Sequence, residues 1–420
     1  MKIKNIRIIN PENGRDEIGD ICVKQGLIAA TDETDEEADE DVIDGTGLIA
    51  GPGLVDIHVH FRDPGQTHKE DIHTGAAAAA AGGFTSVVMM ANTVPPIDSP
   101  ELVQEVLEKG ASEPVRIYTC ATVTKGMKGL ELCRYRELAE AGAVGFTDDG
   151  KPIMDEKLLQ AAFSEIAELN LPVSLHEEDP AFIKESGVNS GQAAKNLGLT
   201  GADRLAEITM IERDLKIAAK TGVKLNIQHI STAEGVSAVR EAKKSNPCIH
   251  AEAAPHHFTL TDSAVEKYGT LAKMNPPLRG SDDREAIWEG LSDGTIDIIA
   301  TDHAPHSLEE KSQDFVKAPS GLIGLETSFL LAYSTLYKKD ILSLSDIFRL
   351  MSLNPARLYG LRAGTLSPGS CADIMIFDPD DTTVYSSSLS KSCNSPFLGK
   401  TFEGKIKYTI VGGKIIYQAQ

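Results

Sequence analysis

The feature that most constrains the fold is a regular alternation of short apolar runs with helical stretches. Eight runs rich in aliphatic and β-branched residues are candidate strands: 54–60, 85–90, 115–121, 143–147, 172–176, 224–229, 248–254 and 296–302. Helical patterns lie between them at 74–81, 101–109, 133–141, 157–168, 202–220, 235–244 and 284–291, with more helix after Thr327. Eight strands alternating with helices are typical of a parallel barrel. We therefore predict an α/β fold, a (β/α)8 TIM barrel over residues 51–362.

An open, doubly wound sheet would produce a similar alternation of elements. Such a sheet usually carries a glycine-rich phosphate turn after its first strand. Here the first candidate strand ends in histidines, His58 and His60. This difference favours the barrel.

The two ends of the chain share a different pattern. Short β-like runs separated by turn residues occupy residues 1–50, and the same pattern returns in residues 363–420. We predict that both ends together form one small β-sandwich-like domain beside the barrel. A length of 420 residues suits a barrel with such an added domain.

Charge and apolar content restrict the partners and the compartment. The formal net charge of −21 argues against nucleic acid or an anionic membrane as a partner. No stretch approaches 18 consecutive apolar residues, and the N-terminus lacks the apolar core of a signal peptide. The cysteines form no C-x-x-C pair and are typical of reduced thiols, at Cys22, Cys120, Cys133, Cys248, Cys371 and Cys393. We predict a cytoplasmic protein that acts on a small molecule.

Histidines and aspartates recur where the candidate strands end. His58 and His60 close the first strand, and their i, i+2 spacing points both side chains to one face. Further polar residues follow the fourth, fifth, sixth and eighth strands, namely Asp148 and Asp149, His176, His229, and Asp302. The carboxyl ends of barrel strands meet at one face of the barrel, so these side chains are predicted to converge.

The convergent residue types predict a metal site. Imidazole and carboxylate ligands without thiolate suit Zn²⁺, with manganese, cobalt or iron as alternatives. Five or six ligands exceed one tetrahedral zinc, so one or two ions per chain are expected, the pair sharing a bridging carboxylate. Two ions would hold one hydroxide, lower the pKa of its parent water to about 7 and polarise a carbonyl. This chemistry attacks an amide or ester carbon.

Several motifs resemble a known family. The run Gly-Leu-Val-Asp-Ile-His-Val-His at 53–60, with the later strand-end histidines and aspartate, resembles the amidohydrolase superfamily. Within it, further segments are similar to the bacterial dihydroorotases that carry an aspartate where related enzymes carry a carboxylated lysine: 58–65, 92–93, 146–150, 273–280 and 300–306. The resemblance covers nearly the whole chain. It implies the reversible cyclisation of N-carbamoyl-L-aspartate to L-dihydroorotate in pyrimidine biosynthesis.

The resemblance also implies a role for each site residue. One metal is held by His58, His60 and Asp302, and the other by His176 and His229, with Asp149 bridging them. Asp302 would be the general base in ring opening and the general acid in ring closure. The substrate α-carboxylate would be bound by Arg62, Asn92 and His306, and the ring by Asn275. His60, Ser320 and Gly321 complete the predicted substrate-binding set.

Some of these residues have alternative interpretations. Arg62 could instead pair with Asp63 or Glu70 at the surface, although its planar fork suits a carboxylate. Asn275 precedes two prolines and could be turn chemistry. Lys151, two residues after Asp149, could be a carboxylated bridging ligand. Asp148 is expected to be a turn or N-cap residue.

The remaining histidines are expected outside the ligand set. His256 and His257 follow the seventh strand, where ligands would be possible by position, but we predict that they surround the site or lie in a loop. His68, His73 and His250 are predicted to be structural.

The sequence departs from the family pattern at two places. Ala91 precedes Asn92 where proline is common, and Ser320 stands where relatives carry an aromatic residue. The second position lies in the long segment 306–324, whose glycines could act as hinges. We predict an active-site lid there.

Two other functions remain in competition. Allantoinases and hydantoinases hydrolyse related cyclic ureides on the same scaffold, and are expected to carry the bridging lysine and to lack the Arg62, Asn92 and His306 set. Some related chains have lost metal ligands and serve as structural partners of aspartate transcarbamoylase. The chain retains every ligand position, which favours catalysis. The resemblance also implies a homodimer and allows association with aspartate transcarbamoylase.

Overall fold

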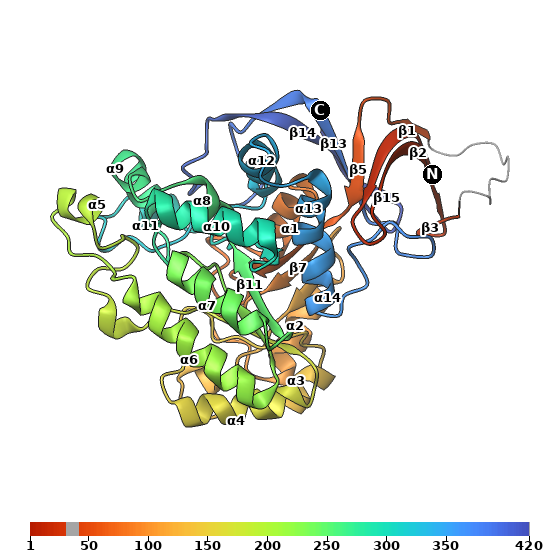
Figure 1. Cartoon of the computed structure of the whole chain (residues 1–420). Helices are drawn as coiled ribbons and strands as arrows, with labels where there is room; N and C mark the ends of the chain where they lie inside the picture. Colours follow the sequence, from red (N-terminus) through yellow and green to blue (C-terminus); the bar gives the residue numbers. More distant parts are fainter. Residues whose placement is uncertain (31–41, 420) are drawn as a thin grey trace.

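The computed structural model describes residues 1–30 and 42–419. Residues 31–41, part of the predicted 1–50 segment, therefore lie outside the described residues. Figure 1 shows parallel strands surrounded by helices, and beside them a sheet that contains strands from both ends of the chain.

The parallel strands occupy seven of the eight predicted places. They are β6 (Leu54–Val59), β7 (Phe84–Met89), β8 (Arg116–Thr119), β9 (Pro172–Leu175), β10 (Lys224–Ile227), β11 (Ile249–Ala253) and β12 (Ile298–Ile299). They pair in sequence order within two sheets, one of β6 to β8 and one of β9 to β12. All of these pairs are parallel, which suits strands connected by crossover helices.

Isolated bridges join the two sheets. The predicted strand at 143–147 is reduced to Phe146, which forms parallel bridges with Ala121 on one side and Val173 on the other. Val59 and His303 form a parallel bridge that closes the opposite side. The pairings therefore run around a complete ring. Two glycines, Gly142 and Gly145, weaken regular pairing in this segment because glycine adds backbone entropy and no side-chain contact.

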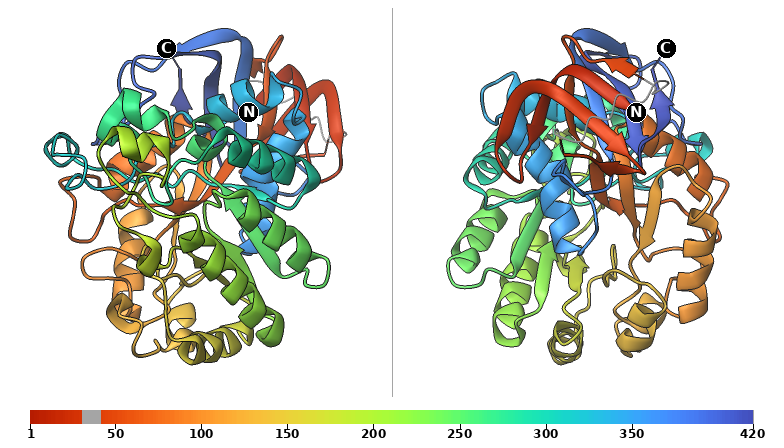
Figure 2. Two further views of the ribbon diagram at one scale, coloured as in Figure 1. Left: turned by 60° about the vertical axis from the view of Figure 1, so that its left-hand side comes forward. Right: turned by 90° about the vertical axis from the view of Figure 1, so that its right-hand side faces the viewer.

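Helices cover the outside of the ring (Figure 2). The longer ones are α1 (Ile72–Ala81), α2 (Pro100–Gly110), α3 (Tyr135–Glu140), α4 (Glu156–Ala167), α6 (Leu205–Thr221), α7 (Ala233–Lys243) and α10 (Ser281–Asp293). Side-chain caps begin several of them, as where Asp71 and Thr74 form a capping box at α1 and Thr232 accepts from Gly235 N at α7. α6 ends at Gly222, whose φ of 72° is the left-handed conformation that glycine accepts readily.

Shorter helical segments complete the fold. They are α5 (Gln192–Asn196), α8 (Pro255–Thr259), α9 (Ala264–Tyr268), α11 (Leu308–Lys311), α12 (Ser328–Ala332), α13 (Leu344–Phe348), α14 (Asn354–Leu358), the 3₁₀ turns η1 (Lys125–Met127), η2 (Pro180–Phe182) and η3 (Gly269–Ala272), and the π turns η4 (Tyr333–Tyr337) and η5 (Arg349–Leu353).

The second sheet joins both ends of the chain. Its strands are β1 (Lys2–Asn10), β2 (Arg15–Lys24), β3 (Leu27–Ile28), β4 (Val42–Asp44), β5 (Ile49–Pro52), β13 (Ile374–Val384), β14 (Thr401–Val411) and β15 (Lys414–Gln418). The order is β15-β14-β13-β5-β1-β2-β3, with β4 also paired to β1. The N-terminal and C-terminal parts meet where β5 and β13 pair antiparallel.

Strand β13 connects two apolar cores because its side chains alternate between two faces. Ile374 and Ile376 pack into a small core with residues of β1 and β2, whereas Met375 and Phe377 pack into the main core of the strand ring. A strand buried on both faces reads as a continuous apolar run. This explains why the segment 374–377 lacks the alternation of a strand with one solvent-exposed face.

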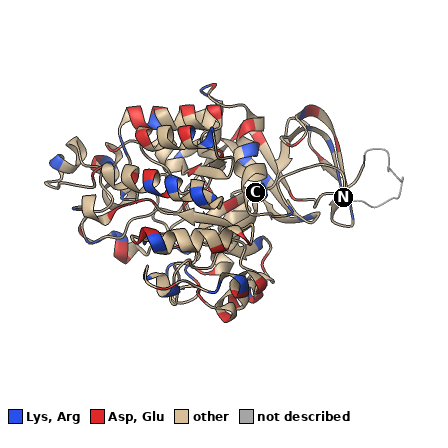
Figure 3. Ribbon diagram, turned by 60° about the horizontal axis from the view of Figure 1, so that its bottom comes forward, with Lys and Arg blue, Asp and Glu red and all other residues tan. Residues whose placement is uncertain are grey.

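Charged side chains are distributed over the outer surface. Figure 3 shows Lys and Arg interspersed with Asp and Glu along the outer helices. None of the helices in the described part of the chain is long and apolar enough to cross a membrane.

Candidate active site

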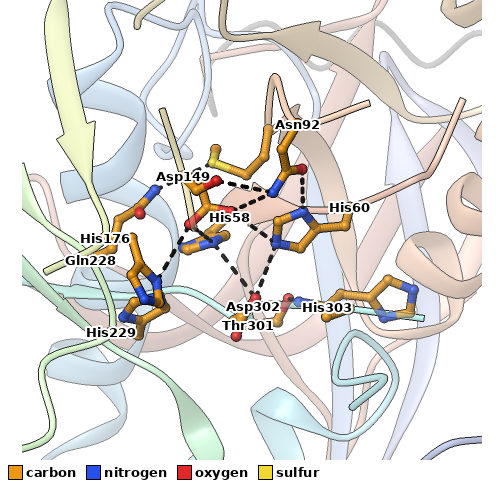
Figure 4. A network of polar contacts seen from close by, with 12 residues as sticks. His58, His60, Asn92, Asp149, His176, Gln228, His229, Thr301, Asp302 and His303 are labelled. Atoms are coloured by element: carbon orange, nitrogen blue, oxygen red, sulfur yellow. Dashed lines mark hydrogen bonds and ion pairs between the residues drawn. The ribbon is translucent and has the colours of Figure 1, made fainter. Parts of the chain in front are cut away.

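The structure brings the predicted metal ligands together at one end of the strand ring (Figure 4). His58 lies in β6 and His60 follows it, while the other ligands follow the ends of β9, β10, β12 and the Phe146 segment. We call these six residues the ligand cluster: His58, His60, Asp149, His176, His229 and Asp302. All six are buried.

One half of the ligand cluster contains His58, His60 and Asp302. Asp302 Oδ1 lies 3.1 Å from His60 Nε2 and 3.6 Å from His58 Nε2. The potential ligand atoms of these three residues all lie within 4.8 Å of one another. This spacing is compatible with three ligands around one ion.

Asp149 lies between the two halves of the cluster. Its Oδ1 is 3.7 Å from His58 Nε2 and 3.8 Å from His176 Nδ1. On the other side of the cluster, His176 Nδ1 and His229 Nε2 are 3.0 Å apart. A carboxylate that faces both halves has the placement that a bridging ligand requires.

Three hydrogen bonds orient the imidazoles. His58 Nδ1 donates to Glu252 Oε1 at 2.5 Å, and His60 Nδ1 donates to Asn92 Oδ1 at 2.9 Å. His176 Nε2 donates to Glu178 Oε2 at 3.0 Å. An oxygen accepts only from a protonated ring nitrogen, so each bond leaves the other nitrogen facing the cluster as a potential ligand atom.

Glu252 and Glu178 were not among the predicted site residues. Glu252 lies in β11 with its side chain buried inside the ring, and Glu178 lies two residues after His176. A signal for Glu252 was present in the sequence, because an acidic residue inside an apolar strand needs a buried partner. No local pattern identifies that partner as His58, which is 194 positions away.

The cluster has the properties of a cation site. Buried His58 Nε2 and His229 Nδ1 have no hydrogen-bond partner. Burial lowers the pKa of His58, but nearby Glu252, Asp149 and Asp302 outweigh this effect and raise it to about 10. Within the described residues, no Lys or Arg forms an ion pair with these three carboxylates. Ring nitrogens without a partner beside an excess of buried negative charge fit a site for divalent cations.

Asp148, Asp149 and Lys151, which follow the fourth predicted strand, differ in their orientation toward the cluster. Asp148 turns away from the cluster and accepts hydrogen bonds from Val123 N at 2.8 Å and Thr124 N at 3.1 Å, which supports the expected turn role. Lys151 is exposed to solvent and does not line the cavity beside the cluster. The geometry therefore favours Asp149 over Lys151 as a ligand.

The other histidines lie outside the cluster. His257 Nε2 donates to Pro276 O at 2.9 Å, and His256 is buried next to it. His73 is at the surface beside Glu113, His250 contacts Asp297 at 2.7 Å, and His68 is exposed.

A cavity of about 370 Å³ adjoins the cluster. Every predicted site residue except His58 lines it: His60, Arg62, Asn92, Asp149, His176, His229, Asn275, Asp302, His306, Ser320 and Gly321. Glu178, Ile183 and Ser186 also line it. Its size suits a small molecule.

Arg62 is available to an anion in this cavity. Asp63, one of its suggested surface partners, pairs with Lys109 at 2.7 Å, and Glu70 contacts His303 at 3.3 Å. Arg62 donates through Nε to Pro305 O at 3.3 Å and approaches His306. Among the described residues it forms no ion pair with a carboxylate.

The other predicted substrate residues have partners within the protein. Asn92 Oδ1 accepts from His60, and its Nδ2 donates to Asp149 Oδ2 at 2.8 Å, so it also links two members of the cluster. Asn275 Oδ1 accepts from Ser186 Oγ at 2.9 Å and Ser320 Oγ at 3.1 Å.

His306 is neutral at physiological pH. Burial and the nearby Arg62 lower its pKa to about 3. Its Nε2 donates to Ser320 O at 2.9 Å, so a substrate must displace this carbonyl to accept the His306 N–H.

Three site residues have strained backbones. Arg62, His229 and Asp302 have φ values of 59°, 30° and 47°, in the left-handed region that residues with a Cβ rarely adopt. Such strain persists where the surrounding structure holds the residue in place, and it occurs frequently at functional sites.

The predicted lid segment is folded against the protein. Lys311 Nζ donates to Pro319 O and Gly321 O, both at 2.9 Å. Lys273 Nζ donates to Phe315 O and Ala318 O, both at 2.7 Å. The bonds from Lys273 hold the segment against the protein, and those from Lys311, which lies within the segment, connect its two ends.

Comparison with known proteins agrees with this geometry. The model of the amidohydrolase family matches residues 49–416, which include the whole ligand cluster. The chain belongs to the amidohydrolase family. Members of this family are generally metal-dependent, and the ligand cluster contains groups that could hold a metal ion.

Relatives within the family are similar over their full length. A protein of Clostridioides difficile named dihydroorotase is 50% identical, with 99% of each chain covered. A dihydroorotase of Streptococcus pneumoniae is 49% identical over the same shares. Among solved structures, an L-hydantoinase (dihydropyrimidinase) from Arthrobacter aurescens has a TM-score of 0.89 and 28% identity, covering 99% of this chain and 96% of its own. A dihydropyrimidinase from Brevibacillus agri, at a TM-score of 0.85 and 22% identity, covers 100% of this chain and 95% of its own and shares the fold.

Proposed function

We propose that this amidohydrolase is a dihydroorotase, which cyclises N-carbamoyl-L-aspartate to L-dihydroorotate and catalyses the reverse hydrolysis. The observation that carries the proposal is the partly buried guanidinium of Arg62, which lines the cavity beside the ligand cluster and forms no ion pair with a carboxylate of the described residues. A guanidinium fork matches a substrate carboxylate in two parallel hydrogen bonds. The relatives that are named dihydroorotase, at 50% and 49% sequence identity, support the same function.

The proposal assigns Zn²⁺ as the cofactor, one or two ions per chain. His58, His60 and Asp302 would hold one ion, His176 and His229 the other, with Asp149 shared. When bound, zinc lowers the pKa of water and polarises a carbonyl group. Nitrogen and oxygen ligands without thiolate are consistent with this metal.

The protein's own residues would bind the substrate and move a proton. Arg62 and Asn92 bind the α-carboxylate, His306 adds an N–H when it leaves the Ser320 carbonyl, and Asn275 contacts the ring. His60, Ser320 and Gly321 shape the cavity around it. In ring opening, Asp302 would accept a proton from the attacking water and pass it to the ring nitrogen that leaves. In ring closure the proton would move the other way, from the attacking carbamoyl nitrogen to the leaving oxygen, which departs as water.

A second candidate is a hydantoinase or related cyclic-ureide hydrolase. The high structural similarity to the hydantoinase favours it as the alternative. These enzymes are expected to carry a bridging lysine, whereas Lys151 of this chain is exposed and Asp149 faces the cluster.

The proposal extends to the setting of the enzyme. It places the protein in the cytoplasm as a homodimer, with association with aspartate transcarbamoylase as a further possibility. The barrel would span residues 51–362, and residues 1–50 and 363–420 would form the small β domain.

The test combines metal analysis of the purified protein with hydrolysis assays. We expect zinc in the protein, activity on L-dihydroorotate exceeding that on allantoin and dihydrouracil, loss of activity after chelation and recovery with Zn²⁺. Full activity in verified metal-free protein would overturn the mechanism. If the protein instead preferred allantoin or dihydrouracil, the function would be that of a hydantoinase or related cyclic-ureide hydrolase.

A further inference from the structure

A segment from the C-terminal part of the chain reaches the substrate cavity. Residues 385–400 connect β13 to β14, and Asn394 within them is buried at 2% exposure. We propose that Asn394 is a positioning residue that sets the distance between the two walls of the cavity. Asn394 is not among the residues that line the cavity.

The segment is anchored before it reaches the cavity. The hydroxyl of Ser390 and the backbone N of Lys391 donate to the buried carboxylate of Glu70. Ser392 Oγ donates to Lys69 O at 2.7 Å. These contacts fix the segment to the residues that follow Arg62, so Asn394 is attached to a rigid support.

The amide of Asn394 contacts both cavity walls. Its Oδ1 accepts from His306 N at 3.0 Å, and its Nδ2 donates to Ala304 O at 3.0 Å. The same Nδ2 donates to Gly321 O at 3.1 Å, and the backbone oxygen of Asn394 accepts from Ile323 N at 3.1 Å. One side chain therefore holds the segment after β12 and the end of the 306–324 segment together.

The held segments carry cavity residues. Ala304, His306, Ser320 and Gly321 all line the cavity, and the bond from His306 Nε2 to Ser320 O spans the two walls. The separation of the walls decides whether the His306 N–H can reach a ligand. This inference rests on the proposed function, in which that ligand is the carboxylate of a small cyclic ureide.

The amide group is matched to its surroundings. Both Nδ2 hydrogens meet carbonyl oxygens, and Oδ1 meets a backbone N–H. Aspartate has nearly the same shape but would place a charged oxygen against the Ala304 and Gly321 carbonyls. Asn394→Asp therefore tests the hydrogen bonds at constant volume, and Asn394→Ala tests the loss of the group.

The experiment measures kcat and KM for L-dihydroorotate in both variants, together with metal content. We expect KM to rise about tenfold or more with kcat reduced less than about threefold, and metal content equal to that of the wild type. Ser388→Ala is the matched control, because Ser388 lies in the same segment but contacts Glu326 and not the cavity walls. In a His306→Ala background, Asn394→Ala should change KM less than about threefold, since coupled residues are not additive.

Hydrogen exchange supplies a readout that does not depend on turnover. The backbone amides of Ala304, His306 and residues 321–323 should exchange faster in both Asn394 variants than in the wild type. In Ser388→Ala they should exchange at the wild-type rate. Three outcomes would each overturn the inference. They are unchanged exchange and KM in the Asn394 variants, an equally large effect in Ser388→Ala, and effects on KM that add to those of His306→Ala. Failure of the wild type to hydrolyse dihydroorotate would refute the proposed function, while the exchange result would still decide the role of Asn394.

Discussion

At the residue scale, the site contains two kinds of charge. Asp149, Asp302 and Glu252 concentrate negative charge in and around the ligand cluster, whereas Arg62 adds a positive group to the lining of the adjoining cavity. The net charge of −21 gives an anionic substrate no general attraction. Recognition of an anion must therefore come from local donors, and Arg62 is the strongest of them.

Replacement of Arg62 tests this recognition. Arg62→Met should lower kcat/KM for L-dihydroorotate about tenfold to a hundredfold, because a hydrogen bond to a charged group contributes about 1.5–3 kcal/mol. Its low rate on dihydrouracil, which has the ring but no carboxylate, should barely change. Arg134→Met is the control, since Arg134 is an exposed partner of Glu137. Equal losses on both substrates would show that Arg62 only supports the site's structure.

Replacement of Glu252 tests how the cluster is oriented. Glu252 Oε1 accepts from His58 Nδ1 and His229 N, and its Oε2 accepts from Asn226 Nδ2 at 3.0 Å. Glu252→Gln places an amide N–H against one of these donors, so metal affinity should fall about tenfold to a hundredfold. Titration of metal into the metal-free protein measures this change.

A compensating substitution provides the control for Glu252. Asn226→Asp in the Glu252→Gln background exchanges donor and acceptor, and should restore part of the metal affinity. Wild-type affinity in Glu252→Gln alone would contradict an orienting role.

At the element scale, the connection between β13 and β14 joins the small sheet to the strand ring. Besides its contacts with Glu70, it meets Glu326, which accepts from the Ser388 hydroxyl and from Leu389 N at 3.1 Å. Glu326 lies just before α12, so the contact links the connection to the helices that follow the strand ring. Burial raises the pKa of Glu326 to about 7, despite these hydrogen bonds.

The raised pKa predicts a pH dependence of stability. A carboxyl whose pKa is higher in the folded state binds a proton more tightly there than in the unfolded chain. The resulting contribution of Glu326 to the free energy of unfolding is complete below about pH 4.5 and is lost as pH rises through 7. Ionisation of Glu326 should therefore cost up to about 3 kcal/mol of unfolding free energy at pH 8. Glu326→Gln should lose less stability between pH 5 and pH 8 than the wild type. Urea unfolding at both pH values measures this, with exposed Glu137→Gln as control, and identical pH profiles for wild type and Glu326→Gln would contradict the prediction.

At the scale of the whole molecule, the two apolar cores share the strands β1, β5, β13 and β14. Phe377 of β13 packs edge-on against Tyr333 and Phe329, with ring centroids 4.8 Å and 5.0 Å apart. These rings belong to the helices that close the main core. The small sheet and the ring are therefore parts of one packed structure.

Removal of this ring should weaken the molecule as a unit. Phe377→Ala should lower the free energy of unfolding by about 3–5 kcal/mol, the cost of a large cavity in a packed core. Fluorescence of Trp288, the single tryptophan, and far-UV circular dichroism should still show one coincident transition. Ile415→Ala, at a partly exposed position of β15, should cost much less. Two separate transitions would show that the sheet unfolds independently.

Local patterns in the sequence determined the elements and the approximate position of the site. Seven candidate strands appear close to their predicted limits, because apolar periodicity and turn residues act within a few positions of the chain. The histidines and aspartates at their ends converge because parallel strands end at one face. The roles assigned to these residues remain predictions.

The tertiary structure alone decided the contacts between distant segments. It paired Glu252 with His58, reduced the fourth strand to Phe146, and brought Asn394 to His306. Local periodicity specifies which face of an element is apolar, but not which distant side chain lies opposite. A buried polar group obtains its partner from the packing of whole elements, so its role becomes visible only when the chain is folded.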